Sequence, residues 1–504
     1  MKKQLHTGTL TFIVATLFLV ITGCSKNDHG IPPGKNIDLI FYGLTSSNEL
    51  IKYNAKSPER TLATIPVTGL ESGEKLLAID FRPATGQLYA VASNSRLYTI
   101  NQETGASRAV GTASFSPAIN GTIAGFDFNP TVDRIRLVTS LGQNLRLNPE
   151  TGTVVMVDGV LNPGTPMVVG AAYTNSVAGA ATTTLFGIDL SSQKLVKQDP
   201  PNNGTLIEVG SLGVTATGDA GFDISPDNSA ALASLTVNNK NNLHYIDINT
   251  GKAHKLGTLG KAIIGLAIPT NPVAYSVDNT NNLLIFNPMA PGTPVSKAIT
   301  NIQPGESILG IDMRPATGQL YALGSSSRVY AINMSTGAAA PIGLTSFTPA
   351  LEGTSFGFDF NPTVDRIRIV SNTGQNLRVH PETGVVAFTD GSLNPGSPAV
   401  TAVAYTNNFA GSTATSLFDI DVATDKLYTQ APPNDGTLAE VGSLGINVDD
   451  NTGFDIGGLS NKGYALLSTG STSKIYSINT TSGKATAIAS FPVSGKGLAV
   501  GLGF

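Results

Sequence analysis

The stretch IDFRPATGQLYA at residues 79–90 returns as IDMRPATGQLYA at residues 311–322, an offset of 232 residues. Without a gap, residues 79–152 and 311–384 are identical at 49 of 74 positions. The same offset relates PPNNGTL at 200–206 to PPNDGTL at 432–438. A match of this length indicates tandem duplication of a whole domain. We place the boundary between the copies near residues 269–272, which predicts domains at 37–270 and 271–504.

A weaker period of about 40 residues runs inside each copy. Its units contain short alternating segments that end in a turn, such as LYTINQETG at 97–105, LRLNPETG at 145–152 and LHYIDINTG at 243–251. Alternation of apolar and polar residues followed by Thr-Gly or similar predicts a strand and a tight turn. Repeated units of three or four such strands are typical of β-propeller blades, which protect their edges by radial stacking. The fold class is therefore all-β and propeller-like.

Each copy ends on an apolar segment that resembles the leading strand of a blade, IIGLAIP at 263–269 and GLAVGLGF at 497–504. Such a segment can complete the first blade of its own copy and close a ring. The sequence thus predicts two tandem rings of about five blades each. The alternative is one large ring of about ten blades, in which the last strand of the chain pairs with the first unit.

Composition agrees with many strands and turns and excludes several classes of function. Of 504 residues, 55 are Gly and 29 are Pro, whereas only 13% are charged. The formal net charge of −4 leaves no electrostatic reason to bind nucleic acid. A single cysteine, Cys24, excludes an intrachain disulfide framework and a thiolate metal site.

The N-terminus has the pattern of a lipoprotein signal peptide. Lys2 and Lys3 precede an apolar run at 10–21, which is shorter than the roughly 20 residues that a spanning helix needs. The following residues, ITGC at 21–24, resemble a bacterial lipobox. This resemblance implies removal of residues 1–23, acylation of Cys24 and a membrane anchor built from several acyl chains. Residues 24–36 are predicted to form a flexible tether, and Ser25 favours sorting to the outer membrane.

The longest unbroken identity between the copies is GFDFNPTVDRIR, at 125–136 and 357–368, followed by GQNLR at 142–146 and 374–378. These strings resemble the bacterial secreted family labelled domain of unknown function 4394, which is grouped with β-propellers. The resemblance covers nearly all of the mature chain, once per copy. It implies a propeller-like fold and carries no established activity.

The polar residues of this motif are the candidate site. Apolar residues alternate with them, which predicts two strands around a turn made by Asn129, Pro130 and Asp133. The acids and arginines could link one blade to the next through ion pairs, or they could line a ligand site at the mouth of the ring. The candidate residues are Asp127, Asn129, Asp133, Arg134, Arg136, Asn144 and Arg146 in copy 1, and Asp359, Asn361, Asp365, Arg366, Arg368, Asn376 and Arg378 in copy 2.

The phosphate-binding signature GxxxxGK and the zinc signature HExxH are absent from the sequence. We therefore assign no catalytic residue, no metal ligand and no cofactor. Asp80, Asp127 and Asp223 recur in similar strands, which favours a shared turn or a hydrogen bond between blades over a catalytic pair. The loop at 447–451 is a weaker alternative as a calcium site. The histidines of the two domains are scattered, and we expect them to be exposed.

These observations predict a non-catalytic binding or scaffold module anchored in the bacterial cell envelope, facing the periplasm or the cell surface. Its expected partners are the membrane, through the lipid, and a glycan, peptide or protein ligand. The alternative is a carboxylate-based hydrolase or lyase that acts on extracellular polymers, with Asp and Arg side chains at the mouth of the ring.

Overall fold

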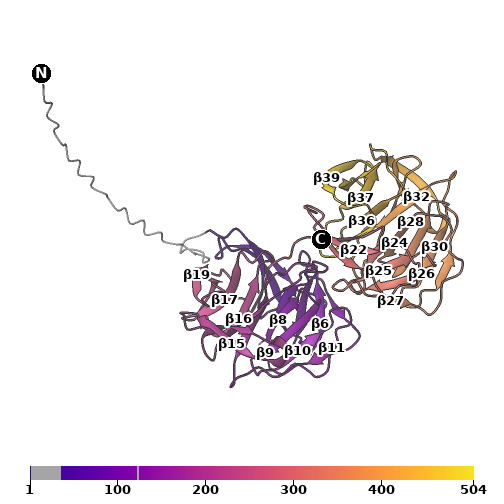
Figure 1. The fold of residues 1–504 in the computed structure, drawn as a ribbon. Coiled ribbons are helices and arrows are strands. Elements are labelled where there is room, and N and C mark those ends of the chain that lie inside the picture. The colour runs from indigo at the N-terminus through magenta and orange to yellow at the C-terminus, as the bar shows by residue number, and fades with distance from the viewer. Residues whose placement is uncertain (2–35, 122–123) are drawn as a thin grey trace.

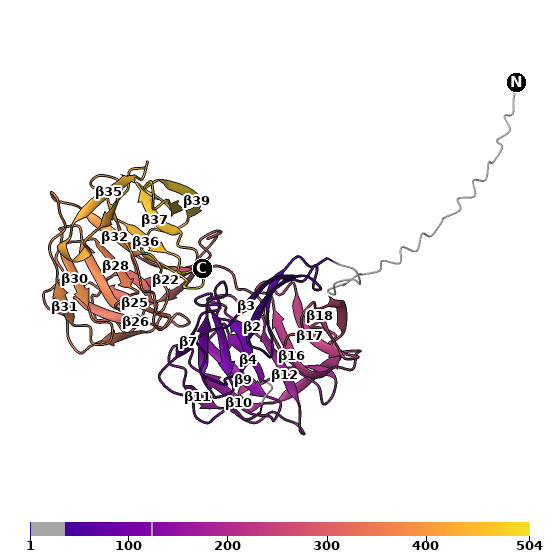
Figure 2. The same cartoon turned by 180° about the vertical axis from the view of Figure 1, so that it is seen from behind.

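The computed structural model describes residue 1, residues 36–121 and residues 124–504. The predicted lipidation site at Cys24, the cleavage site before it and nearly all of the tether lie outside the described residues. Within the described part of the chain, each sequence copy forms a ring of antiparallel four-stranded sheets (Figures 1 and 2). The described residues contain no helix long and apolar enough to cross a membrane.

The first ring consists of five sheets whose inner strands surround a common axis. Written from the axis outward, the blades are β20 (Gly265–Ala267), β1 (Ile40–Leu44), β2 (Glu49–Asn54) and β3 (Thr61–Pro66); β4 (Leu76–Phe81), β5 (Leu88–Ala92), β6 (Leu97–Ile100) and β7 (Ser107–Val110); β8 (Ala124–Asn129), β9 (Arg134–Thr139), β10 (Asn144–Leu147) and β11 (Val154–Val157); β12 (Val168–Tyr173), β13 (Leu185–Asp189), β14 (Lys194–Gln198) and β15 (Leu206–Ser211); β16 (Thr217–Ile224), β17 (Ala231–Val237), β18 (Lys240–Ile246) and β19 (Ala253–Thr258). A short 3-10 helix, η1 (Pro201–Asn203), lies between β14 and β15.

The second ring repeats this plan in the described residues of copy 2. Its blades are β40 (Gly495–Val500), β21 (Ala274–Asp278), β22 (Asn282–Phe286) and β23 (Val295–Ala298); β24 (Ile308–Arg314), β25 (Gln319–Gly324), β26 (Arg328–Ile332) and β27 (Ala339–Ile342); β28 (Phe356–Asn361), β29 (Arg366–Ser371), β30 (Asn376–Val379) and β31 (Val386–Thr389); β32 (Val400–Tyr405), β33 (Leu417–Asp421), β34 (Lys426–Gln430) and β35 (Leu438–Ser443); β36 (Thr452–Ile456), β37 (Gly463–Thr469), β38 (Thr472–Ile478) and β39 (Ala485–Phe491). The 3-10 helix η2 (Pro433–Asp435) is the counterpart of η1.

Each ring is closed by its own last strand. β20 pairs with β1, with Leu266 opposite Gly43, and β40 pairs with β21, with Ala499 opposite Tyr275. The two closing strands lie in the segments that the sequence predicts. The alternative of a single ring of about ten blades is therefore wrong, because it needs β40 to pair with β1.

The repeated Thr-Gly turns follow from side-chain capping. Asn101 accepts hydrogen bonds on Oδ1 from the backbone N–H groups of Glu103 (2.9 Å) and Thr104 (3.0 Å), which folds the chain back after β6. Gly105 then takes a φ of 75°, in the left-handed region that costs other residues steric strain. The same local chemistry recurs at the ends of other third strands, so the hairpins form from short-range information.

The core lies between neighbouring blades rather than inside one sheet. Phe126 and Phe128 of β8 pack with Tyr89 of β5, and the Tyr89 and Phe128 rings meet edge to face at 5.2 Å between centroids. Close approach of the inner strands requires glycine, because a Cβ atom on Gly221 would overlap the backbone of Leu266 in the closing strand. Burial of these faces is the main source of stability of the rings.

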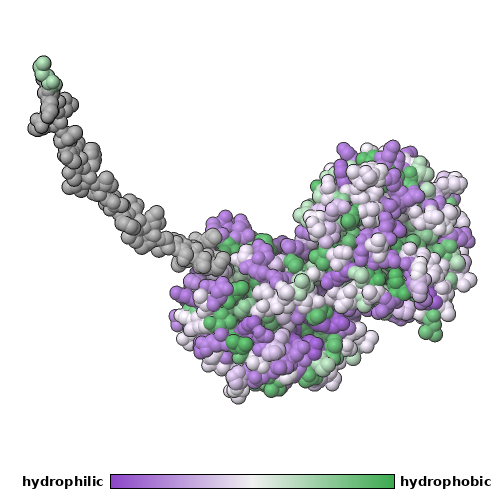
Figure 3. All heavy atoms as spheres, in the orientation of Figure 1, coloured by the Kyte–Doolittle hydropathy of each residue, from purple (hydrophilic) through white to green (hydrophobic). Residues whose placement is uncertain are grey.

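The two rings contact each other directly, and the C-terminus lies between them (Figures 1 and 2). Across this contact, the Tyr275 hydroxyl donates to the Ala84 carbonyl (2.9 Å) and the Gly503 N–H donates to the Thr85 carbonyl (2.9 Å). Gln319 also donates to Glu150 across it (2.9 Å). Figure 3 shows hydrophilic and hydrophobic residues interspersed on the visible face of both rings.

Candidate functional site

The arginines of the repeated motif meet at an acid that the sequence interpretation missed. Arg136 of β9 donates from Nη1 to Asp158 Oδ2 (2.6 Å) and to Asn144 Oδ1 (2.7 Å). Arg146 of β10 donates two further hydrogen bonds to Asp158, at 2.8 and 3.0 Å. The Asp158 side chain is 4% exposed and that of Arg136 is 2% exposed, so this is a buried ion pair.

This network joins two blades. Arg136 Nη2 donates to Asn202 Oδ1 (2.8 Å), and Asn144 donates to the Pro201 carbonyl (3.1 Å), both in η1 beyond β14. Arg136 Nε reaches the Tyr173 hydroxyl at 3.4 Å, at the end of β12. Asp158 could have been found from sequence, because the string DG-x-LNPG repeats at 158–164 and 390–396.

Copy 2 builds the same network with the same partners. Arg368 donates to Asp390 (2.6 Å) and Asn376 (2.7 Å), and Arg378 donates two hydrogen bonds to Asp390, at 2.7 and 2.8 Å. Arg368 also donates to Asn434 of η2 (2.9 Å). The agreement of both copies assigns these residues to the linkage of blades.

The remaining motif residues do not join that network. Asp133 accepts hydrogen bonds from Arg82 of the preceding blade, at 2.9 Å from Nε, and Asn129 caps the turn through the N–H of Thr131 (3.0 Å). Arg134 donates to the backbone carbonyl of Asp133 (2.8 Å). In copy 2, the corresponding contacts are Arg314 with Asp365, Asn361 with the N–H of Thr363, and Arg366 with the Asp365 carbonyl.

Asp127 lies apart from both groups, on the axis of its ring. Asp80 accepts the N–H of Phe128 (2.8 Å), Asp127 accepts that of Tyr173 (3.2 Å) and Asp223 accepts that of Ile268 (2.6 Å). Each acid thus bonds the inner strand of the next blade, as the sequence interpretation favours. In copy 2, the same bonds run from the N–H groups of Phe360, Tyr405 and Val500 to Asp312, Asp359 and Asp455, at 2.8, 3.1 and 2.6 Å.

Burial changes the titration of these axial acids. It raises the pKa of Asp223 and of Asp455 to about 7. Burial, together with repulsion from the neighbouring carboxylates, raises the pKa of Asp80 and Asp127 well above the usual range. The hydrolase hypothesis requires such acids at an open mouth of the ring. Their burial against backbone amides contradicts that placement.

Two further predictions can be compared with the structure. In the loop at 447–451, Asp449 and Asp450 are exposed, and the described residues bring three acidic groups together only on the ring axes. His244 is buried, contrary to the expectation of exposed histidines, and burial lowers its pKa to about 4. Asp419, which corresponds to Gly187 in copy 1, is a buried acid. Its two carboxylate oxygens have no partner in the described structure, and burial raises its pKa.

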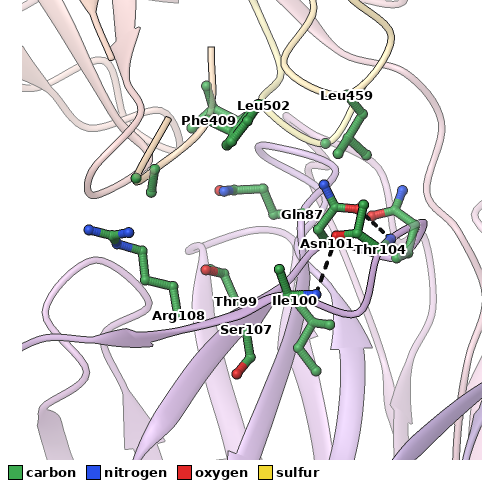
Figure 4. A pocket seen from close by; sticks show the side chains of 15 residues that line it. Gln87, Thr99, Ile100, Asn101, Thr104, Ser107, Arg108, Phe409, Leu459 and Leu502 are labelled. Carbon is green, nitrogen blue, oxygen red and sulfur yellow. Dashed lines mark hydrogen bonds between the residues drawn. The ribbon is translucent and has the colours of Figure 1, made fainter. Parts of the chain in front are cut away.

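A cavity of about 400 Å³ lies between the rings. No residue of the repeated GFDFNPTVDRIR and GQNLR strings lines it. The first ring contributes polar groups that include Gln87, Thr99 and Arg108, and the second ring contributes Phe409 and Leu459 from loops of two different blades. Figure 4 shows these apolar side chains on one side of the cavity and Arg108 on the other. Arg108 is exposed, and its side chain makes no hydrogen bond or ion pair with any described residue.

The two copies differ at this cavity. Thr99, Gln102, Ser107 and Arg108 of the first ring correspond to Ala331, Met334, Ala339 and Ala340 of the second ring. On the opposite side, Leu459 and Leu502 correspond to Asp227 and Thr270. The cavity therefore has a polar wall and an apolar wall that the duplication alone would not have produced.

Comparison with known proteins identifies the family. The family model described as "Domain of unknown function (DUF4394)" matches residues 49–267 and residues 282–500, which together are most of the chain. The chain belongs to the DUF4394 family. The two matches correspond to the two rings, so this DUF4394 protein has two tandem all-β, propeller-like domains.

No curated protein sequence matches this DUF4394 chain significantly. Among solved structures it is similar to the extracellular domain of a putative one-component system from B. thetaiotaomicron, with 12% identity and a TM-score of 0.27, over 90% of this chain and 65% of that one. It is also similar to the Dos1 propeller, with 12% identity and a TM-score of 0.25, over 64% of this chain and 82% of that one. A third similar structure is PorZ, a surface component of the type-IX secretion system of Porphyromonas gingivalis, with 11% identity and a TM-score of 0.25, over 91% of this chain and 61% of that one. The assignment of the DUF4394 fold rests on the strand pairing of the chain itself.

Proposed function

We propose that this DUF4394 protein is a lipid-anchored, non-catalytic binding module of the bacterial cell envelope, and that its ligand occupies the cavity between the two rings. A volume of about 400 Å³ is within the range of small-molecule and peptide sites. The observation that carries the proposal is the unpaired guanidinium of Arg108 opposite an apolar wall. This pairing suits a ligand with a carboxylate and an apolar side chain.

The chemistry of the cavity favours a short peptide with a C-terminal carboxylate over a glycan. Arg108 can bind a carboxylate through two parallel hydrogen bonds. The opposite wall consists of Phe409, Leu459 and Leu502, which suit an apolar side chain better than the polar edge of a sugar. The cavity is formed by both rings together, since Arg108 comes from the first ring and Phe409, Leu459 and Leu502 come from the second.

Replacement of Arg108 tests the proposal. We expect Arg108→Ala, which introduces the residue found at position 340, to weaken binding of carboxylate-terminated peptides by about 10-fold or more, because a charge-assisted hydrogen bond contributes about 1.5–3 kcal/mol. Fluorescence polarisation with a library of labelled peptides, free and amidated at the C-terminus, measures this effect. The control is Arg60→Ala, at an exposed arginine outside the cavity. Equal binding by both variants, or binding of glycans alone, would contradict the peptide proposal.

The anchor is tested separately. Cys24→Ala removes the only thiol of the chain, so the full-length protein can no longer be acylated there. We expect the variant to move from the membrane fraction to the soluble fraction after cell lysis without detergent, whereas the unmodified protein stays with the membrane. Retention of the variant in the membrane fraction would show that another feature holds the protein there.

A further inference from the structure

Three acids converge on the axis of each ring. In the first ring, Asp80, Asp127 and Asp223 come from the inner strands β4, β8 and β16, and one carboxylate oxygen from each lies within 4.8 Å of the other two. In the second ring, Asp312, Asp359 and Asp455 repeat the arrangement. We call these two groups the axial triads. The other two inner strands of the first ring carry Ala172 and Ala267 at the equivalent positions, just before the residues whose N–H groups bind Asp127 and Asp223.

The charge of the axial triads is not balanced by the protein. All six acids are 4% exposed or less. Among the described residues, none of the six has a Lys, Arg or His side chain within the 4.0 Å of an ion pair. Burial of three carboxylates without a cation is strongly unfavourable, so each triad must take up protons or a metal ion.

Unused oxygen atoms provide a second observation. Asp312 is 0% exposed and Asp359 is 1% exposed, yet Asp312 Oδ1 and Asp359 Oδ2 have no hydrogen-bond partner in the described structure. Buried polar atoms are nearly always satisfied by protein, water or ions. In addition, residues that lie one and two positions before the acids line a small cavity on the axis of each ring, with room for about one water-sized group (about 10 Å³).

We propose that each axial triad binds one calcium ion, so that the chain carries two. The ligands are oxygen atoms only, which selects a hard cation. The oxygen atoms of each triad lie within 4.8 Å of one another, so one ion at calcium–oxygen distances of about 2.3–2.6 Å can contact all three. Ca²⁺ also accepts irregular coordination, whereas Mg²⁺ requires near-ideal octahedral geometry and keeps several waters. Since the three acids belong to three blades, the ion holds the ring together and is structural.

The experiment uses the full-length protein in detergent, stripped with EGTA and titrated with CaCl₂ at pH 8 by calorimetry. We expect two ions per chain and a rise in Tm of about 5 °C or more in excess calcium, since a ligand at 100 times its Kd stabilises the folded state substantially. Asp127→Asn and Asp359→Asn should each reduce the stoichiometry to one ion. Asp449→Asn, in the exposed loop at 447–451, is the control and should leave two ions bound.

A second measurement does not depend on variants that fold. Titration of the unmodified protein at pH 8 with CaCl₂ and, separately, with MgCl₂ should show two calcium ions per chain and weaker binding of magnesium, because Mg²⁺ requires near-ideal octahedral geometry and keeps several waters. The absence of calcium binding, equal binding of Mg²⁺, or loss of an ion in Asp449→Asn would overturn the proposal. None of these outcomes bears on the peptide site, which is measured with Arg108→Ala.

Discussion

Truncation of the chain after Ser494 is expected to unfold the second ring. The deletion removes β40, which supplies the inner strand of the first blade of this ring and pairs with β21. Leu498, Ala499 and Val500 are each 2% exposed or less, and the Val500 N–H binds Asp455. The lost burial and pairing amount to on the order of 5 kcal/mol, which is comparable with the whole stability of a domain.

Limited proteolysis with mass spectrometry measures this effect. We expect cleavage throughout residues 274–494 and protection of the first ring, which is closed by its own strand β20. The matched control ends at Val500, which keeps β40 and removes residues 501–504, with the Gly503 contact to Thr85, the buried Leu502 and the Phe504 ring that stacks on Tyr464. This control should retain both rings. A protease-resistant second ring in the shorter chain would contradict closure by β40.

Asp158→Ala is expected to destabilise the first ring by about 3–5 kcal/mol, because it leaves the buried guanidinium of Arg136 without its carboxylate. Arg146 loses two hydrogen bonds at the same time. For a ring of this size, such a loss lowers Tm by roughly 10 °C. Differential scanning calorimetry of the full-length variant measures the shift, and Asp390→Ala should have the same effect on the second ring.

Glu208→Ala is the matched control for this prediction. Glu208 pairs with Lys194 at 2.6 Å, but its side chain is 57% exposed. Solvent and salt screen such a pair, so its loss should change the free energy of unfolding by about 1 kcal/mol or less. If Asp158→Ala also changed the free energy of unfolding by only about 1 kcal/mol or less, the network of Arg136 would not hold the blades together.

The fold could be predicted from sequence because its information is local and repeated. Each hairpin is specified by alternation and by a cap such as Asn101, and the duplication shows the same pattern twice. Ring closure was also predictable, since the segments at 263–269 and 497–504 look like inner strands without partners in their own units. Each of these segments forms its backbone hydrogen bonds with a strand more than 200 residues earlier, β1 for the first ring and β21 for the second.

The candidate site was predicted only in part. Sequence proximity grouped Asp127, Asp133 and Arg136, and Asp127 is paired with Arg136 across β8 and β9, yet the three side chains bond to three different partners, the Tyr173 N–H, Arg82 and Asp158. Asp158 and Asn202 were missed because they lie in loops 22 and 66 residues from Arg136. Nothing in the local pattern of either loop indicates which arginine it will contact.

The sequence by itself determined the tandem duplication, the repeated β-strand units and the family, because repeated local patterns specify strands and turns. Only the tertiary structure decided which acids share an axis and which walls form the cavity between the rings. Ring closure places Asp80 beside Asp223, which lies more than 140 residues away, and docking of the rings places Arg108 opposite Phe409. Such contacts depend on the packing of whole blades, which no segment of the chain encodes alone.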